Sequence, residues 1–169
     1  MQVSNFMFPN AFAFSSFFGK KNDSDSQTPP PAAAIDEKTK VRQLVADIVE
    51  AVNTQDMERF LALHTDTAVI MKDNQPNAVG KKAVEAFIAP LFEAMKQPQY
   101  QARLELKVKN LQIVGDWAFG SGDFAFVKVC PDTAEPQGFD SFSFIARRQP
   151  DGTWLRSHLS TTGKLLTEN

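Results

Sequence analysis

Apolar and polar residues alternate in several segments between residues 102 and 162, and clusters of Gly, Pro and Asp separate these segments. Side chains of a β-strand point to the two faces of a sheet in turn, so this alternation is typical of strands with one buried face. We expect strands at about 102–113, 117–129, 138–148 and 153–162, joined by turns. This half of the chain therefore predicts an antiparallel meander.

The preceding residues have the spacing of amphipathic helices. Apolar residues recur every three or four positions over 41–52, which predicts a helix beginning near Ile35. A shorter helix should follow Asp56, whose carboxylate can cap it, and a third should cover 81–96, where Pro90 should kink or split it. Helices first and a sheet last favour an α+β fold in which the helices cover one face of the sheet.

Residues 1–34 differ in composition from the rest. Six phenylalanines lie before residue 19, and a polar stretch with three consecutive prolines follows them. We assign 1–34 as a Phe-rich tip with a linker and 35–169 as one domain. The tip is either a disordered end or a motif that docks on a partner protein, a membrane surface or its own domain. It has neither the length of a transmembrane segment nor the charge order of a secretory signal, so we expect a cytoplasmic protein.

Charge and cysteine content exclude several classes of function. The formal net charge is −2, and phosphate binding needs a clustered excess of Lys and Arg, so we expect no nucleic acid partner. Cys130 is the single cysteine, which excludes an internal disulfide and a cysteine-based metal site. The two histidines, His64 and His158, stand apart from any carboxylate cluster. We therefore expect no metal and no cofactor.

The order of the elements resembles the nuclear transport factor 2-like superfamily. The residues that carry the resemblance are the run 65–69, the loop that ends in Gly80-Lys81, and the closing Asp151-Gly152-Thr153-Trp154. Relatives include SnoaL-like polyketide cyclases, ketosteroid isomerases and the association domain of calmodulin-dependent kinases. From about Asp36 onward, the resemblance implies a cystatin-like cone, in which a curved antiparallel sheet wraps around three N-terminal helices. It also implies a pocket on the concave side and frequent dimerisation through the outer face of the sheet, so we expect a homodimer.

The register of the strands decides which side chains line such a pocket, because a slip of one residue exchanges the two faces. Apolar alternation assigns seven ligand-binding residues to the inner face: Phe124, Phe126, Phe142, Phe144, Ser157, Leu159 and Thr161. Four residues of the last strand then face outward, toward a dimer interface, or line the pocket if the register differs: Trp154, Arg156, His158 and Ser160. In the second case, Arg156 would bind an anion beside His158. Gly120 and Gly122 either leave room for a ligand or only let their strand bend.

Asp140 is the candidate catalytic residue. The run Asp140-Ser141-Phe142-Ser143-Phe144 resembles a segment of ketosteroid isomerases. The resemblance implies that Asp140 lies in the apolar pocket, stays protonated and donates a hydrogen bond to an enolate. The alternative places it, solvated, at the margin of the sheet. Because the positions of the family's Tyr and general base fall near Ile48 and near Met71 or Lys72, steroid isomerisation is not expected.

Two classes of function follow from these observations. The first is a dimeric module that binds a small hydrophobic ligand or a protein partner, with the Phe-rich tip recruiting a further protein. The alternative is an acid–base enzyme, an isomerase, cyclase or dehydratase, that acts on a small apolar carbonyl compound. We favour the module because the partners that Asp140 would need are missing, and leave open whether the chain is an enzyme.

Overall fold

The computed structural model describes residues 32–73, 75–97, 102–128 and 140–162. Within these ranges the elements are α1 (Ala32–Asn53), α2 (Met57–Ala62), β1 (His64–Lys72), β2 (Ala78–Val79), α3 (Lys81–Met95), β3 (Ala102–Val114), β4 (Trp117–Lys128), β5 (Asp140–Arg148) and β6 (Trp154–Thr161). The first helix begins close to the expected start of the domain. The Phe-rich tip and Cys130 lie outside the described residues.

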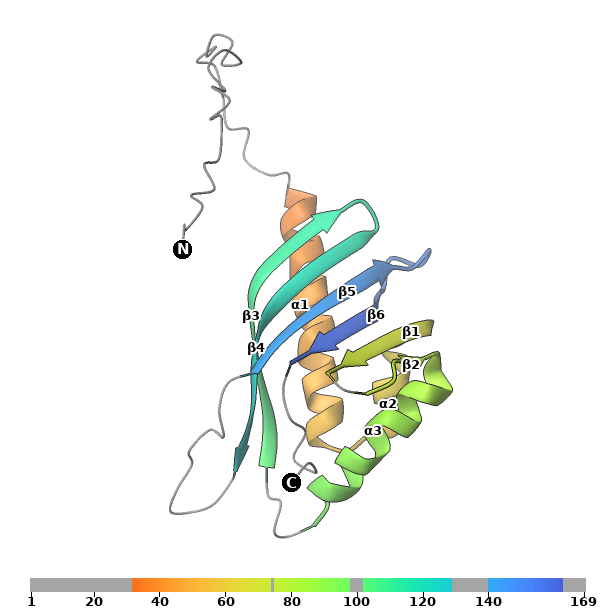
Figure 1. Ribbon diagram of the computed structural model, residues 1–169. Coiled ribbons are helices and arrows are strands. Elements are labelled where there is room, and N and C mark those ends of the chain that lie inside the picture. Colours follow the sequence, from red (N-terminus) through yellow and green to blue (C-terminus); the bar gives the residue numbers. More distant parts are fainter. Residues whose placement is uncertain (1–31, 74, 98–101, 129–139, 163–169) are drawn as a thin grey trace, which may run out of the picture.

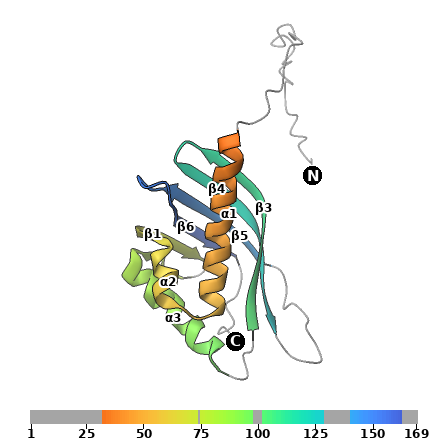
Figure 2. The same cartoon turned by 180° about the vertical axis from the view of Figure 1, so that it is seen from behind.

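The strands form one curved sheet that bends around the helices. Their order is β2-β1-β6-β5-β4-β3, and β3 to β6 make the antiparallel meander that the sequence predicts. Strand β1 lies parallel to β6 and is antiparallel to β2. Figures 1 and 2 show that the helices cover one face of the sheet, with α1 lying along its hollow side. The α+β, cone-shaped prediction is therefore confirmed.

The helices begin and end for local reasons. Asp56 caps α2 as predicted, because its carboxylate accepts a hydrogen bond from the backbone N–H of Arg59 at 3.0 Å. The end of α1 is tied to β3 by Asn53, whose side-chain amide exchanges two hydrogen bonds with the backbone of Leu104, at 3.0 and 2.7 Å. Helix α3 continues through Pro90 from Lys81 to Met95, so the proline does not split it. Pro90 itself is exposed.

A β-bulge bends β3 and changes which of its side chains face the helices. The register shifts between Val108 and Asn110, so the inward residues have even numbers before the bulge and odd numbers from Leu111 onward. At this place a Cβ on Gly122 would lie 1.9 Å from the carbonyl oxygen of Lys107. Gly122 therefore allows the close approach of β3 and does not leave room for a ligand.

The inner faces of β4 and β5 are apolar, as their alternation predicts. Phe124, Phe126, Phe142 and Phe144 are all buried among the residues of the core. The ring of Phe144 fills the space above Gly120, where an added Cβ would lie 2.1 Å from it. Gly120 and Gly122 therefore allow close packing within the sheet.

Strand β6 departs from the predicted register. Ala146 of β5 is paired with Arg156 and Ile145 with His158, so Ser157 is an extra residue in a second bulge. Beyond the bulge the predicted faces are right, with Leu159 and Thr161 inward and His158 outward. Before it the outward assignment of Trp154 and Arg156 is wrong, because the bulge reverses their faces and both are buried. Arg156 instead lines the cavity, as expected for the alternative register.

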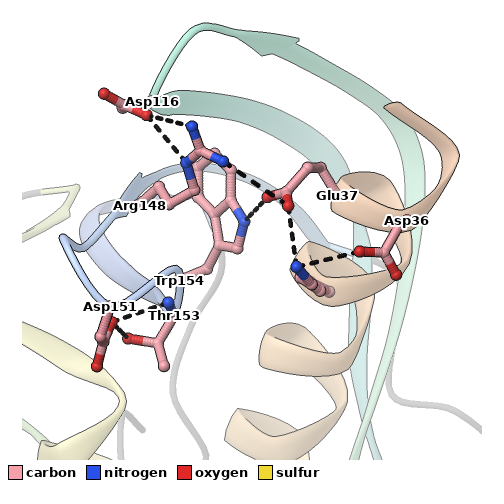
Figure 3. A network of polar contacts seen from close by, with 8 residues as sticks. Asp36, Glu37, Asp116, Arg148, Asp151, Thr153 and Trp154 are labelled. Carbon is pink, nitrogen blue, oxygen red and sulfur yellow. Dashed lines mark hydrogen bonds and ion pairs between the residues drawn. The ribbon is translucent and has the colours of Figure 1, made fainter. Parts of the chain in front are cut away.

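Trp154 is held inward by a polar network near the start of α1 (Figure 3). Its indole N–H donates to the carboxylate of Glu37 at 2.6 Å. Lys40 also contacts this carboxylate, at 3.0 Å, and these two hydrogen bonds hold the pKa of Glu37 below its usual value. Arg148 extends the network to Asp116, with a hydrogen bond of 2.9 Å. The network fastens the first helix to the β5–β6 turn and explains why a tryptophan opens β6.

Candidate functional site

A cavity lies between the hollow face of the sheet and the helices. Its volume is about 80 Å³. Among the described residues, the wall is apolar apart from one guanidinium and one hydroxyl. Its side chains come from three helices and five strands: Ile48, Val52, Phe60, Ile70, Phe87, Ile88, Leu91, Leu104, Leu106, Phe124, Phe126, Phe142, Arg156, Leu159 and Thr161. Such a chamber can enclose a small, mainly apolar molecule.

Arg156 contributes the charged group of this mainly apolar wall. It leaves 7% of its surface exposed, and its Nε–H donates to the Nε2 atom of His64 at 2.9 Å. The guanidinium carbon lies 5.6 Å from the ring centroid of Phe60, where a cation is attracted by the π-face of the ring. The backbone N–H of Arg156 donates to the carbonyl of Leu63 at 2.9 Å. The segment from Phe60 to His64 therefore fixes the arginine through both its backbone and its side chain.

The contacts of His64 define its protonation state. A guanidinium can only donate, so Nε2 of His64 is an acceptor and carries no proton. The other nitrogen, Nδ1, lies 2.6 Å from the carbonyl oxygen of Phe60 and must donate to it. Burial, reinforced by the charge of Arg156, lowers the pKa of His64 to about 2. His64 is thus a neutral imidazole whose two nitrogens are both engaged.

Arg156 remains a cation without an anionic partner among the described residues. Burial lowers its pKa to about 9, which still leaves it charged at neutral pH. None of the ion pairs formed within the described ranges involves it, and its only side-chain hydrogen bond to these residues uses Nε. The two terminal nitrogens of the guanidinium form no hydrogen bond to the described residues, and Arg156 is part of the cavity wall.

The structure separates the other predicted site residues. Asp140 opens β5 opposite Phe124, is half-buried, and is not part of the cavity wall. Phe144 and Ser157 are buried beside the cavity without lining it; Ser157 instead donates to the carbonyl of Ile145 at 3.1 Å. The remaining predicted pocket residues line it. His158 and Ser160 lie on the opposite face of the sheet, where they border a depression with Met71, Phe119 and Ile145.

Sequence reasoning missed the pairing of His64 with Arg156. From the sequence alone, His64 has no role at the site, and Arg156 lies in the pocket only if the register differs. The two residues are far apart in the sequence, and only the parallel pairing of β1 with β6 brings them together. One signal was present, since Arg156 lies two residues after Trp154, a large aromatic residue that is expected to be buried.

Two further findings bear on the kind of site. In the parts of the chain that the structure describes, no group of three or more His, Cys, Asp and Glu side chains is placed to hold a metal ion. Among the described helices, none has the length and apolar character needed to cross a membrane.

Comparison with known proteins places the fold in context. No curated protein matches the sequence significantly. A nuclear transport factor 2-like protein with a cystatin-like fold from Novosphingobium aromaticivorans is similar with a TM-score of 0.65 and 17% identity, over 81% of this chain and 86% of that one. A ketosteroid isomerase-like protein from Erwinia carotovora atroseptica gives a TM-score of 0.58 and 21% identity, over 75% and 95% of the two chains.

A third similar structure is a Thiobacillus denitrificans protein that is provisionally assigned as a calcium/calmodulin-dependent protein kinase type II association domain. It gives a TM-score of 0.61 and 16% identity, over 72% of this chain and 92% of that one. At these identities the likeness shows the fold alone. The family model of the SnoaL-like domain matches residues 45–156, which is more than half of the chain and includes both His64 and Arg156. The chain therefore belongs to the SnoaL-like domain family and has the nuclear transport factor 2-like fold.

Proposed function

We propose that the protein is a dimeric binding module whose cavity holds a small, mainly apolar ligand. The observation that carries this proposal is the composition of the cavity wall, in which apolar side chains surround Arg156 and Thr161. Apolar walls with a few fixed polar groups are the usual make-up of small-molecule sites. A merely structural core would be expected to fill this space with side chains, because protein interiors are close-packed.

Binding is better supported than acid–base catalysis. A general acid or base must reach the reacting atoms, and none of the described residues that line the cavity is a carboxylate. Asp140 lies outside this wall, and the nitrogens of His64 are occupied by Arg156 and by the carbonyl of Phe60. The described residues of the site can therefore bind and orient a molecule, but none of them is placed to move a proton.

The outer face of the sheet supports the dimer. Trp117 and Phe119 are 39% and 44% exposed on the face opposite the helices, and they are joined there by half-buried Ile145 and Met71. Exposed aromatic residues of this kind are enriched at protein interfaces. We expect sedimentation to give the mass of a dimer and Phe119→Glu to give a monomer, with Lys82→Glu on α3 as the charge control. A monomeric wild type would refute this part of the proposal.

The ligand proposal is tested with a substitution that fills the cavity. Leu159→Trp places an indole inside it, whereas Leu155→Trp changes the same residue type on the same strand outside the cavity wall. We expect small apolar compounds, such as cyclohexanone, benzyl alcohol and hexanoate, to raise the melting temperature of the wild type and of Leu155→Trp, but not of Leu159→Trp. The proposal fails if none of them stabilises the wild type, or if Leu159→Trp responds as the wild type does.

A further inference from the structure

We infer that the ligand of this cavity is a small monocarboxylate, whose carboxylate is held by the terminal nitrogens of Arg156 and whose apolar body fills the remaining space. This inference rests on the proposed binding function and specifies the chemical class of the ligand. It follows from the charge of Arg156, from the edge of its guanidinium that is left unused, and from the apolar wall around it.

The charge of Arg156 needs an anion. A buried cation is stable when it is paired, and a neutral imidazole with an aromatic face compensates it only in part. Within the described ranges no carboxylate lies close enough to form an ion pair with Arg156, although arginines at the surface, Arg59 and Arg148, have such partners. An anionic group supplied by a ligand would complete the site.

The geometry of the guanidinium favours a carboxylate. Nε is occupied by His64, so the edge that carries the two terminal nitrogens remains, and this edge presents two parallel N–H donors. A planar carboxylate accepts both bonds at once, which is the bidentate arrangement that arginine forms best. His64, fixed in turn by the carbonyl of Phe60, holds Nε, so this edge is free of hydrogen bonds to the described residues.

The balance of charge limits the anion to a single negative charge. Arg156 is the one charged residue among the described residues of the cavity wall, and His64, which is hydrogen-bonded to it, is neutral. A phosphate monoester carries nearly two negative charges at neutral pH and would leave one of them buried and unpaired. The hydrophobic side chains that make up the rest of the wall require an aliphatic or aromatic body on the same molecule.

Calorimetric titration of the full chain with matched probes tests the inference. Benzoate and hexanoate carry a carboxylate, benzamide and hexanamide are their neutral counterparts, and phenyl phosphate carries the larger charge. We expect the wild type to bind each carboxylate at least about tenfold more tightly than its amide, since charge-assisted hydrogen bonds are about twice as strong as neutral ones. Benzoate should also bind more tightly than phenyl phosphate.

Arg156→Met removes the charge and keeps a side chain that fits the apolar wall, and Arg147→Met, on the exposed face of β5, is the matched control. The preference for carboxylates should disappear in Arg156→Met and persist in Arg147→Met. A preference that survives in Arg156→Met overturns the assignment of Arg156. Should Arg156→Met fail to fold, the comparison of carboxylates with amides in the wild type still decides the class of ligand.

The possible outcomes distinguish the monocarboxylate inference from the proposed function, the binding of a small apolar ligand. Equal affinity for carboxylate and amide, or tighter binding of phenyl phosphate, overturns the monocarboxylate and leaves the apolar binding site standing. Binding of none of the five probes, together with no response to the neutral compounds named above, overturns both.

Discussion

The neutral state of His64 makes the stability of the fold depend on pH in a way that can be calculated. In the unfolded chain a histidine titrates with a pKa of about 6.5, whereas burial lowers the pKa of folded His64 to about 2. Below pH 6.5 the unfolded chain therefore binds a proton that the folded chain does not. Stability is fully present above this pH and is lost progressively as the pH falls toward 2.

The size of the loss follows from one proton. The unfolded histidine is protonated over the last ~1.5 pH units between its pKa of about 6.5 and pH 5.0, whereas folded His64 is not. At about 1.36 kcal/mol per pH unit, this lowers the free energy of unfolding by about 2 kcal/mol between pH 7.5 and pH 5.0. This value requires only that folded His64 stays neutral at pH 5.0. Its buried position, its hydrogen bond to the carbonyl of Phe60 and the donor of Arg156 on its other nitrogen all favour the neutral form.

Urea unfolding at fixed protein concentration measures this effect when three proteins are compared. Wild type and His158→Gln should lose about 2 kcal/mol more than His64→Gln between pH 7.5 and pH 5.0, because carboxylates contribute equally to all three. His158 is the matched control, since it is the other histidine of the chain and is half-buried on the outer face of the sheet. Parallel pH profiles for wild type and His64→Gln would refute the reasoning.

Three further predictions concern the packing around the sheet. Gly120→Ala should lower the free energy of unfolding by about 1 to 3 kcal/mol, because its Cβ would overlap the ring of Phe144; an unchanged urea midpoint would argue against that contact. Asn53→Ala should cost about 2 kcal/mol in the same assay through the loss of two hydrogen bonds to the backbone of β3, and a loss below about 0.5 kcal/mol would contradict this. Fluorescence of Trp117→Phe should report a shielded, blue-shifted Trp154 that resists acrylamide, while Trp154→Phe should report an exposed Trp117; the reverse result would restore the register predicted from the sequence.

The architecture could be predicted from the sequence because each element carries its own periodic signal. Alternation over 102–162 and helical spacing over 41–52 each report which side chains are buried, and these patterns correspond to the strands and helices observed. The bulge in β3 is also visible in the sequence, since its inward apolar residues change from even to odd numbers between Val108 and Leu111.

The site could not be predicted in the same way, because a second bulge lies where the signal is polar. In β6, Arg156 lines the cavity just before the bulge at Ser157, and Leu159 lines it after the bulge. A charged residue such as Arg156 is ordinarily assigned to the solvent face. Alternation based on Leu155 and Leu159 therefore predicts a single register without a bulge, and this register places Trp154 on the outer face of the sheet instead of the inner one. The partner of Arg156 comes from β1, and pairing between distant strands leaves no local pattern to read.

Crystals of the full chain soaked with 4-bromobenzoate would test most directly whether the space under the sheet is an apolar site with a cationic end. The anomalous signal of bromine locates the ligand independently of how the rest of the map is interpreted. We predict a bromine peak inside the cavity, among the side chains of Ile48, Leu106 and Phe142, with the carboxylate against Arg156. Bromine bound only on the outer face of the sheet, or side chains that leave no space beside Arg156, would contradict the account.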